Sequence, residues 1–190
     1  MYHFVADDFL AGISTKQVNT KEELMPFAEE AFRQLTGSPL PKDIFITLCT
    51  ESELAKAFGE GFTPDVQGFC RNRCGFGTSE VFVKRQELAR AMLTLGHEIG
   101  HALSPTLPDA KDEEAKAFAF ALAWMQAIRE HNIGGLTAAI LPRPAQNGLH
   151  NVALHFVLEL ASAGSTFMET FINLCKGIVT INKVPEQVFR

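Results

Sequence analysis

The sequence predicts an α+β protein in which a small mixed sheet packs on a helix over residues 85–103, followed by a mainly helical C-terminal half. Three short stretches rich in β-forming residues come early in the chain, at 43–49, 66–70 and 80–84. Apolar residues then recur with helical spacing through 85–103 and through most of the later chain. Strands confined to the first half of the chain, followed by a mainly helical second half, favour the α+β class.

The first predicted element is an amphipathic helix over 21–35. Thr20 can cap its N-terminus, and Glu23 stands three residues later, which is the capping-box pattern. Gly37 and Pro39 end the helix.

The predicted sheet comes next. The stretch 43–49 is a strand, and 51–58 is a short helix that Gly59 ends. The stretch 66–70 is a second strand. After a glycine-rich loop, 80–84 alternates between apolar and charged residues. This alternation predicts a third strand that is exposed on one side.

The helix predicted over 85–103 has one continuous apolar stripe, formed by Leu88, Met92, Leu95, Ile99 and Leu103. His97 and His101 lie on a different face, so the helix can be anchored by one side and present its histidines from another. Ser104 and Pro105 end it. A polar turn leads to further predicted helices over 113–130, 146–163 and 166–176.

The stretch from His97 to His101, His-Glu-Ile-Gly-His, is the most informative motif in the chain. Histidines four residues apart on a helix lie on one face about one turn apart, so both can reach one metal ion. Glu98 can then approach a water molecule held at that ion and act as a general base. This H-E-x-x-H arrangement is typical of zinc-dependent hydrolases, and Zn²⁺ is the expected cofactor.

A catalytic zinc site needs a third protein ligand. The best candidate is Glu114, thirteen residues after His101, on the helix that is predicted to run alongside. Glu113 and Asp112 are adjacent alternatives, although acids in a first helical turn also favour the helix dipole without binding metal.

A later helix offers a second set of polar residues. His155 and Glu159 are four residues apart and could line the cleft, with His155 as a hydrogen-bond donor to the transition state. The alternative is a solvated side-chain pair. Many such enzymes use Tyr or His to hold the oxyanion, but the one tyrosine, Tyr2, is far from the motif in sequence.

Composition and charge exclude several classes of protein. The chain has 190 residues, 46% hydrophobic and 21% charged, which is ordinary for a globular protein of one domain. The net charge of −5 gives no support for nucleic-acid binding. The start of the chain is unlike a signal peptide, and the most apolar run, 115–128, is too short to span a bilayer. We therefore expect a soluble cytoplasmic protein without a nucleic-acid or membrane partner.

The four cysteines (Cys49, Cys70, Cys74 and Cys175) are expected to be reduced thiols in that compartment. A Cys70–Cys74 disulfide or a second metal site is the alternative, although the spacing is not one of the common zinc-ribbon patterns.

From about Val66 to Met125 the chain resembles the ImmA/IrrE-type metallopeptidases, which belong to the gluzincin-like zinc proteases. The resemblance lies in Gly68-Phe69, in Val81-Phe82-Val83, in the nine residues from Leu95 to Leu103 and in the six residues from Glu114 to Ala119. It implies a zincin-type helix, with His97, His101 and Glu114 as zinc ligands and Glu98 as catalytic base. It also implies that the strand of Val81, Phe82 and Val83 pairs with an extended peptide substrate.

The chain departs from the family in several places. The gap between His101 and Glu114 is short, and Phe118 stands four residues after Glu114, where many gluzincins hold a supporting acid. The helical C-terminal part is not covered by the resemblance. We accordingly expect one domain over 1–190, with a helix and sheet in 1–84, the metal-binding helices in 85–131 and a helical extension in 132–190.

The first functional hypothesis is a zinc-dependent peptidase that hydrolyses peptide bonds of a peptide or protein substrate through a metal-activated water, with Glu98 as general base. The second is a non-catalytic, metal-binding regulatory or interaction protein that keeps the peptidase fold. A third makes the motif accidental on an ordinary core helix. Metal content before and after His97→Ala distinguishes the third hypothesis from the other two. The sequence does not predict the oligomeric state.

Overall fold

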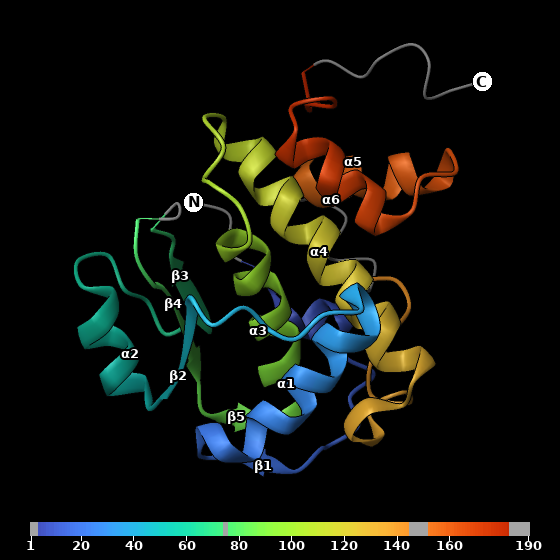
Figure 1. The fold of residues 1–190 in the computed structure, drawn as a ribbon. Helices are drawn as coiled ribbons and strands as arrows, with labels where there is room; N and C mark the ends of the chain where they lie inside the picture. Colours follow the sequence, from blue (N-terminus) through green and yellow to red (C-terminus); the bar gives the residue numbers. More distant parts are fainter. Residues whose placement is uncertain (1–3, 74–75, 145–151, 183–190) are drawn as a thin grey trace.

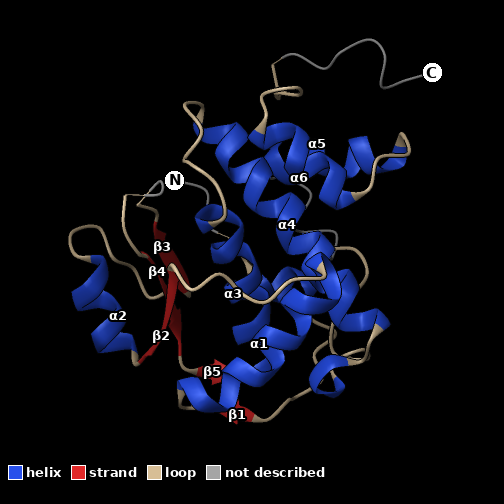
Figure 2. Cartoon of the chain, viewed as in Figure 1, coloured by secondary structure: helices blue, strands red, loops and turns tan. Residues whose placement is uncertain are grey.

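The computed structural model describes residues 4–73, 76–144 and 152–182, and within them the protein is α+β, as predicted (Figures 1 and 2). Two short 3₁₀ helices accompany the main elements, at Ala6–Phe9 and Ile133–Gly135. The strands are β1 (Gln17–Val18), β2 (Ile44–Cys49), β3 (Gly68–Arg71), β4 (Ser79–Lys84) and β5 (Gln86–Glu87). The helices are α1 (Lys21–Thr36), α2 (Glu51–Phe58), α3 (Leu88–Ala102), α4 (Ala110–Glu130), α5 (Val152–Ser162) and α6 (Phe167–Cys175).

The main sheet is mixed and has the order β2-β4-β3. β2 runs parallel to β4, with Ile46 opposite Val81, and β3 runs antiparallel to β4, with Phe69 opposite Phe82. The prediction that the third strand is exposed on one side is wrong. β4 is the central strand: Val81 packs in the main core with α3, while Phe82 packs in a second cluster with residues of α2.

Helix α3 starts three residues later than the sequence predicted, because Gln86–Glu87 forms β5 and pairs with β1. The N-terminal segment then binds the first amide groups of α3. Leu88 N donates to Lys16 O at 2.8 Å, and Ala89 N donates to Thr15 Oγ1 at 3.1 Å. Two of the amide groups that have no acceptor within the helix are thus satisfied by the segment that precedes α1.

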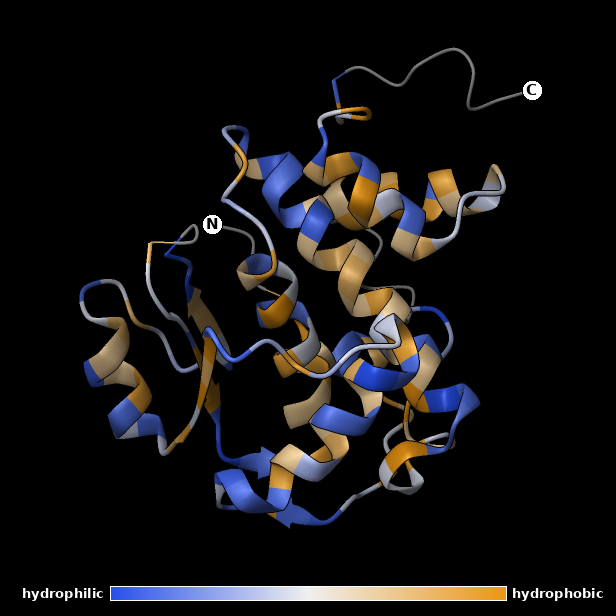
Figure 3. Cartoon of the chain, viewed as in Figure 1, coloured by the Kyte–Doolittle hydropathy of each residue, from blue (hydrophilic) through white to orange (hydrophobic). Residues whose placement is uncertain are grey.

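The predicted apolar stripe is buried from Leu88 to Ile99, while Leu103, which follows α3, is partly exposed; the other faces of the helix are buried too. Every residue from Leu88 to Gly100 is buried, apart from partly exposed Arg90. α3 lies between the sheet on one side and α4 on the other (Figure 1). The hydrophobic residues gather where these layers face each other, and hydrophilic residues lie on the outer turns of α1 and α2 (Figure 3). The motif is therefore on a central helix.

The C-terminal half is mainly helical in its described part. α4 runs alongside α3, and α5 and α6 pack on α4 (Figure 1). α4 begins at Ala110, earlier than the predicted 113, because Asp109 caps it by accepting from the amides of Lys111 and Asp112. The residues described include no helix with the length and apolar character that crossing a membrane requires.

Local capping signals determined several helix starts. The predicted box of Thr20 and Glu23 is confirmed, with both reciprocal hydrogen bonds present. α2 and α6 begin with the same motif, at Thr50 with Glu53 and at Thr166 with Glu169.

Candidate metal centre

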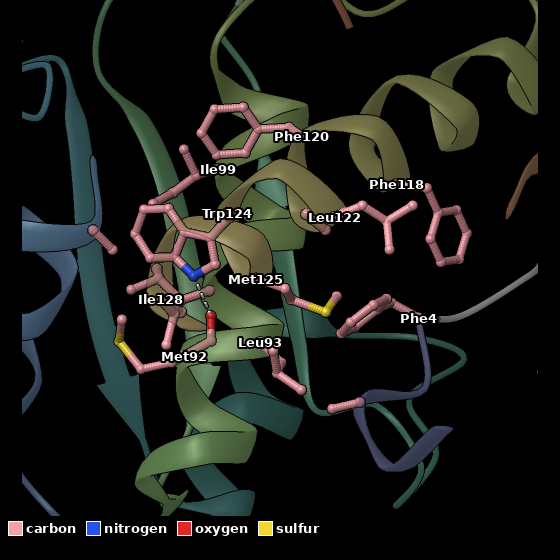
Figure 4. Packing of buried hydrophobic residues seen from close by; sticks show 14 of the residues in the cluster. Phe4, Met92, Leu93, Ile99, Phe118, Phe120, Leu122, Trp124, Met125 and Ile128 are labelled. Carbon is pink, nitrogen blue, oxygen red and sulfur yellow. Dashed lines mark hydrogen bonds between the residues drawn. The ribbon is translucent and has the colours of Figure 1, made fainter. Parts of the chain in front are cut away.

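Two glycines let α3 and α4 approach closely at the motif. A β-carbon on Gly96 would lie 2.5 Å from Cδ1 of Trp124, and one on Gly100 would lie 2.9 Å from Cα of Ala117. Trp124 fills the space beside Gly96 and donates from its indole nitrogen to Met92 O at 2.9 Å (Figure 4). The short distance between the helices brings the first turns of α4 opposite the last turn of α3.

This approach brings together the three predicted ligands, His97, His101 and Glu114. The Nε2 atoms of the two imidazoles are 3.2 Å apart. Glu114 Oε2 lies 3.5 Å from His97 Nε2, and Glu114 Oε1 lies 3.9 Å from His101 Nε2. Ligand atoms around a tetrahedral zinc ion, at about 2.0–2.1 Å from it, lie about 3.3 Å from one another. The three groups therefore match the spacing that one ion requires.

The protonation states of His97 and Glu114 also suit a cation. Burial lowers the pKa of His97 to about 4, so its imidazole is neutral at pH 7. Burial opposes the charge of Glu114, but the neighbouring His97 and His101 outweigh it and lower the pKa of that carboxyl group. Glu114 Oε2 is buried and has no hydrogen-bond partner in the described protein. A buried carboxylate oxygen without a donor is costly, and a bound cation supplies the missing partner.

Glu113, which the sequence left open as an alternative ligand, does not belong to the cluster of three ligand groups. Its Oε1 lies 2.7 Å from His101 Nδ1, the ring nitrogen that faces away from the ligand cluster. Its Oε2 accepts from Leu107 N at 2.7 Å and from Lys116 Nζ at 2.9 Å. A carboxylate on the second nitrogen of a ligating histidine fixes the tautomer and the ring orientation. Glu113 thus occupies the position that a supporting acid of a ligating His101 would take, although it does not lie four residues after Glu114.

The acidic groups around His101 change the pKa of its imidazole. Burial lowers its pKa, but the hydrogen bond to Glu113 and the charges of Glu98 and Glu114 outweigh burial, and the pKa of His101 is raised.

Asp112, the other alternative ligand, points elsewhere: its Oδ1 accepts from Ile181 N at 2.7 Å. It ties the start of α4 to the segment after α6.

His97 is held by aromatic rings. Phe4 stacks on its imidazole at 4.6 Å between centroids, and Phe118 meets it edge-on at 5.0 Å. Its Nδ1 is buried without a hydrogen-bond partner in the described residues. No sequence signal pointed to Phe4, because it is 93 positions from His97 and in a different element. Tyr2, two residues before Phe4, lies outside the described residues.

Glu98 lies beside the three ligands and lines the same cavity. Its side chain is buried, and burial raises its pKa to about 7. A carboxyl group with a pKa near 7 can take up and release a proton at neutral pH.

The cavity has a volume of about 340 Å³. On one side it is lined by the motif residues and by the start of α4. On the other it is lined by β3 and by the end of α2, with Phe58, Val66 and Phe69 as its apolar wall. Gly68 lets β3 come close, because a β-carbon there would lie 2.6 Å from Cγ2 of Thr94 and 3.4 Å from Cγ of Glu98.

The strand predicted to pair with a substrate does not have an open edge. Val81, Phe82 and Val83 lie in the central strand β4, whose two edges are bonded to β2 and β3. Alternation in the sequence indicated a strand but did not indicate its position in the sheet. The edge strand beside the motif is β3, and its residues Gly68, Phe69 and Cys70 line the cavity.

His155 and Glu159 do not reach the centre. Both are exposed on α5, where they pair with each other at 3.2 Å, and neither lines the cavity. The solvated side-chain pair, which the sequence left open, describes them, and the prediction of His155 as a transition-state donor is not supported.

The cysteines are only partly described. Cys49 and Cys175 carry free thiols, and Cys70 lies at the cavity wall. Cys74 lies outside the described residues, so the state of the Cys70–Cys74 pair stays a prediction.

No protein-family model, curated protein or solved structure matches this chain. The functional interpretation therefore depends on the arrangement of its own residues.

Proposed function

We propose that this protein is a zinc-dependent peptidase of the H-E-x-x-H type, with a zincin-type active-site helix that resembles that of the ImmA/IrrE metallopeptidases. The observation that carries this proposal is the convergence of His97, His101 and Glu114 within 4.8 Å of one another on a cavity that Glu98 also lines. Two imidazoles and one carboxylate, with an open side toward a cavity, are a ligand set of catalytic zinc.

Each residue of the centre has a distinct role in the proposed reaction. His97, His101 and Glu114 hold the ion, and Glu113 orients His101. When bound, zinc supplies Lewis-acid chemistry: it lowers the pKa of water to about 7 and polarises a carbonyl group. Glu98 takes a proton from the attacking water and delivers it to the leaving amine.

The edge strand β3 supports a peptide as substrate. Its outer edge is not bonded to another strand of the described sheet, and it lies along the cavity. An extended peptide can add to such an edge through backbone hydrogen bonds. The wall of Phe58, Val66 and Phe69 then favours an apolar side chain in the peptide.

The decisive experiment compares the wild-type protein with Glu98→Gln. Both proteins should bind one zinc ion per chain, because Glu98 is not a ligand. Only the wild type should cleave members of a peptide library, detected by mass spectrometry. Full activity of the Glu98→Gln variant on a genuine substrate would show that the proposed mechanism is wrong.

A non-catalytic metal-binding protein is the second candidate, and one observation favours it. Among the described residues that line the cavity, the only imidazoles are those of the two proposed ligands, and there is no tyrosine or arginine. The amide nitrogen of Asn72 already donates to His101 O and Ser104 O. If this candidate is correct, zinc raises the thermal stability strongly, and no peptide in the library is cleaved.

A further inference from the structure

Lys116 is a fully buried lysine in the second turn of α4, with no exposed side-chain surface. A buried ammonium group is costly unless it is paired and hydrogen-bonded. Its Nζ lies 2.9 Å from Glu113 Oε2 and 3.1 Å from Ser104 Oγ. Two carbonyl oxygens, of His101 and Pro105, lie at 3.4 Å. The site surrounds the cation with oxygen atoms.

These oxygens come from the segment that carries the metal ligands. The carbonyl of His101 is in the last turn of α3, where backbone carbonyls have no partner within the helix. Ser104 and Pro105 form the connection that leads to α4. One ammonium group thus joins the end of α3, the connecting turn and the start of α4, which together supply His101 and Glu114.

Lys116 reaches the ligands through Glu113. The carboxylate of Glu113 binds Lys116 with Oε2 and His101 Nδ1 with Oε1. Without the cation, Oε2 keeps only the amide of Leu107, and a buried carboxylate with fewer donors holds its position less firmly. The chain Lys116–Glu113–His101 is continuous and reaches the imidazole at Nδ1, whereas Nε2 of the same ring faces His97 and Glu114.

We propose that Lys116 is a positioning residue of the metal centre, which fixes Glu113 and through it the imidazole of His101. This proposal rests on the metal site of the proposed function, but it concerns metal binding and not hydrolysis. Loss of an outer partner of a ligating histidine typically lowers metal affinity 10- to 100-fold.

The test is a zinc titration against a competing chelator, using the full chain with Lys116→Met and with Lys111→Met. Met matches the unbranched shape of lysine, and Lys111 is an exposed lysine on the same helix. Lys116→Met should weaken zinc binding about 10-fold or more and change the visible absorption of the Co²⁺-loaded protein. Lys111→Met should leave both unchanged.

A double-mutant cycle separates positioning from general destabilisation. In a Glu113→Gln background, Lys116→Met should change the zinc affinity by less than about twofold, because the residue through which Lys116 acts has already lost its charge. An equal loss in both backgrounds, or a normal Kd and Co²⁺ spectrum for Lys116→Met, overturns the proposal. If Lys116→Met does not fold, Lys116→Gln replaces it, and Glu113→Gln alone must still weaken zinc binding about 10-fold.

The outcomes also distinguish this inference from the proposed function. Zinc binding that depends on Lys116 in a protein that cleaves no peptide supports the inference and contradicts the peptidase. If the protein cleaves peptides and Lys116→Met binds zinc as tightly as the wild type, the peptidase is supported and the inference is overturned. A wild-type chain that binds no zinc contradicts both.

Discussion

At the residue scale, Glu113 and Glu114 are adjacent acids with different partners. Successive residues of a helix point about 100° apart, so Glu114 faces the ligand cluster while Glu113 turns toward the outer nitrogen of His101. The sequence could predict that an acid at this place lies close to the two histidines, because the spacing to His101 allows a second helix to run alongside. It could not assign Glu113, because two of that residue's partners, His101 Nδ1 and Leu107 N, lie outside α4 and reach it only through the path of the connecting turn.

The raised pKa of Glu98 predicts a pH-dependent stability difference. Burial raises this pKa from 4.5 to about 7, so the folded state binds the proton more tightly than the unfolded state does. The contribution of protonated Glu98 to the free energy of unfolding is therefore fully present below pH 4.5 and is lost as the pH rises through 7. Since glutamine does not titrate, metal-free Glu98→Gln should become more stable than the metal-free wild type toward pH 8, by about 3 kcal/mol.

Urea unfolding of the two metal-free proteins at several pH values measures this difference. Glu30→Gln, at an exposed position of α1, is the control and should follow the wild type. A constant difference between Glu98→Gln and the wild type from pH 5 to pH 8 would contradict the role of burial.

At the element scale, the sequence identified the helices better than the arrangement of the strands. Capping boxes and breakers are local signals, and the predicted bounds of α1 and α2 agree with the structure to within one residue. The order β2-β4-β3 depends on a parallel pairing between strands separated by α2. Nothing in the alternation of residues 80–84 shows which strand lies at an edge, so the sequence could not show that both edges of β4 are bonded to other strands.

The close packing of α3 on α4 predicts that Gly100→Ala destabilises the protein. Alanine favours a helix by about 1 kcal/mol over glycine, which alone would be stabilising. At Gly100 the added carbon meets backbone, Cα of Ala117 at 2.9 Å, and cannot be accommodated by a side-chain rotation. We expect a net loss of about 1–3 kcal/mol in the free energy of unfolding and weaker zinc binding, because α4 carries Glu114. Lys111→Ala is the control; a Gly100→Ala protein as stable as the wild type contradicts the close approach.

The end of α2 predicts a matched pair of specificity variants. Phe58 and Phe62 pack on each other in the same aromatic cluster, at 6.0 Å between centroids, but only Phe58 lines the cavity. If the protein is a peptidase, Phe58→Ala should lower kcat/KM for peptides with a large apolar side chain about 10-fold relative to alanine peptides. Phe62→Ala should leave this ratio unchanged, and equal effects of the two variants would mean that the wall does not contact substrate.

At the scale of the whole molecule, the centre depends on segments far apart in the sequence. Phe4 stacks on His97, and Ser14 and Thr15 bind the side chain of Glu87, at the start of α3. One hydrophobic cluster includes residues from Phe4 to Val179. Such contacts form only when the chain folds as a whole. Local patterns therefore predicted the helix that carries the motif, but they did not predict that the N-terminal segment packs on His97.

This dependence on the whole fold predicts that zinc stabilises the entire protein. A ligand that binds only the folded state at 100 times its Kd adds about 2.7 kcal/mol, which for a chain of this size corresponds to a rise in Tm of about 5–10 °C. Protons compete with zinc for the same imidazoles. Because the pKa of His101 is raised in the metal-free protein, the rise in Tm should be large at pH 8 and should shrink as the pH falls toward 5.5.

Thermal unfolding with and without zinc, at both pH values, tests this expectation. His97→Ala should abolish the rise, because it removes a buried ligand. His131→Ala removes an exposed imidazole just after α4 and should retain the full rise. A rise in Tm that persists in His97→Ala, or that is as large at pH 5.5 as at pH 8, would place the stabilising zinc at some other site, since neither result is compatible with an ion held by the imidazoles of α3.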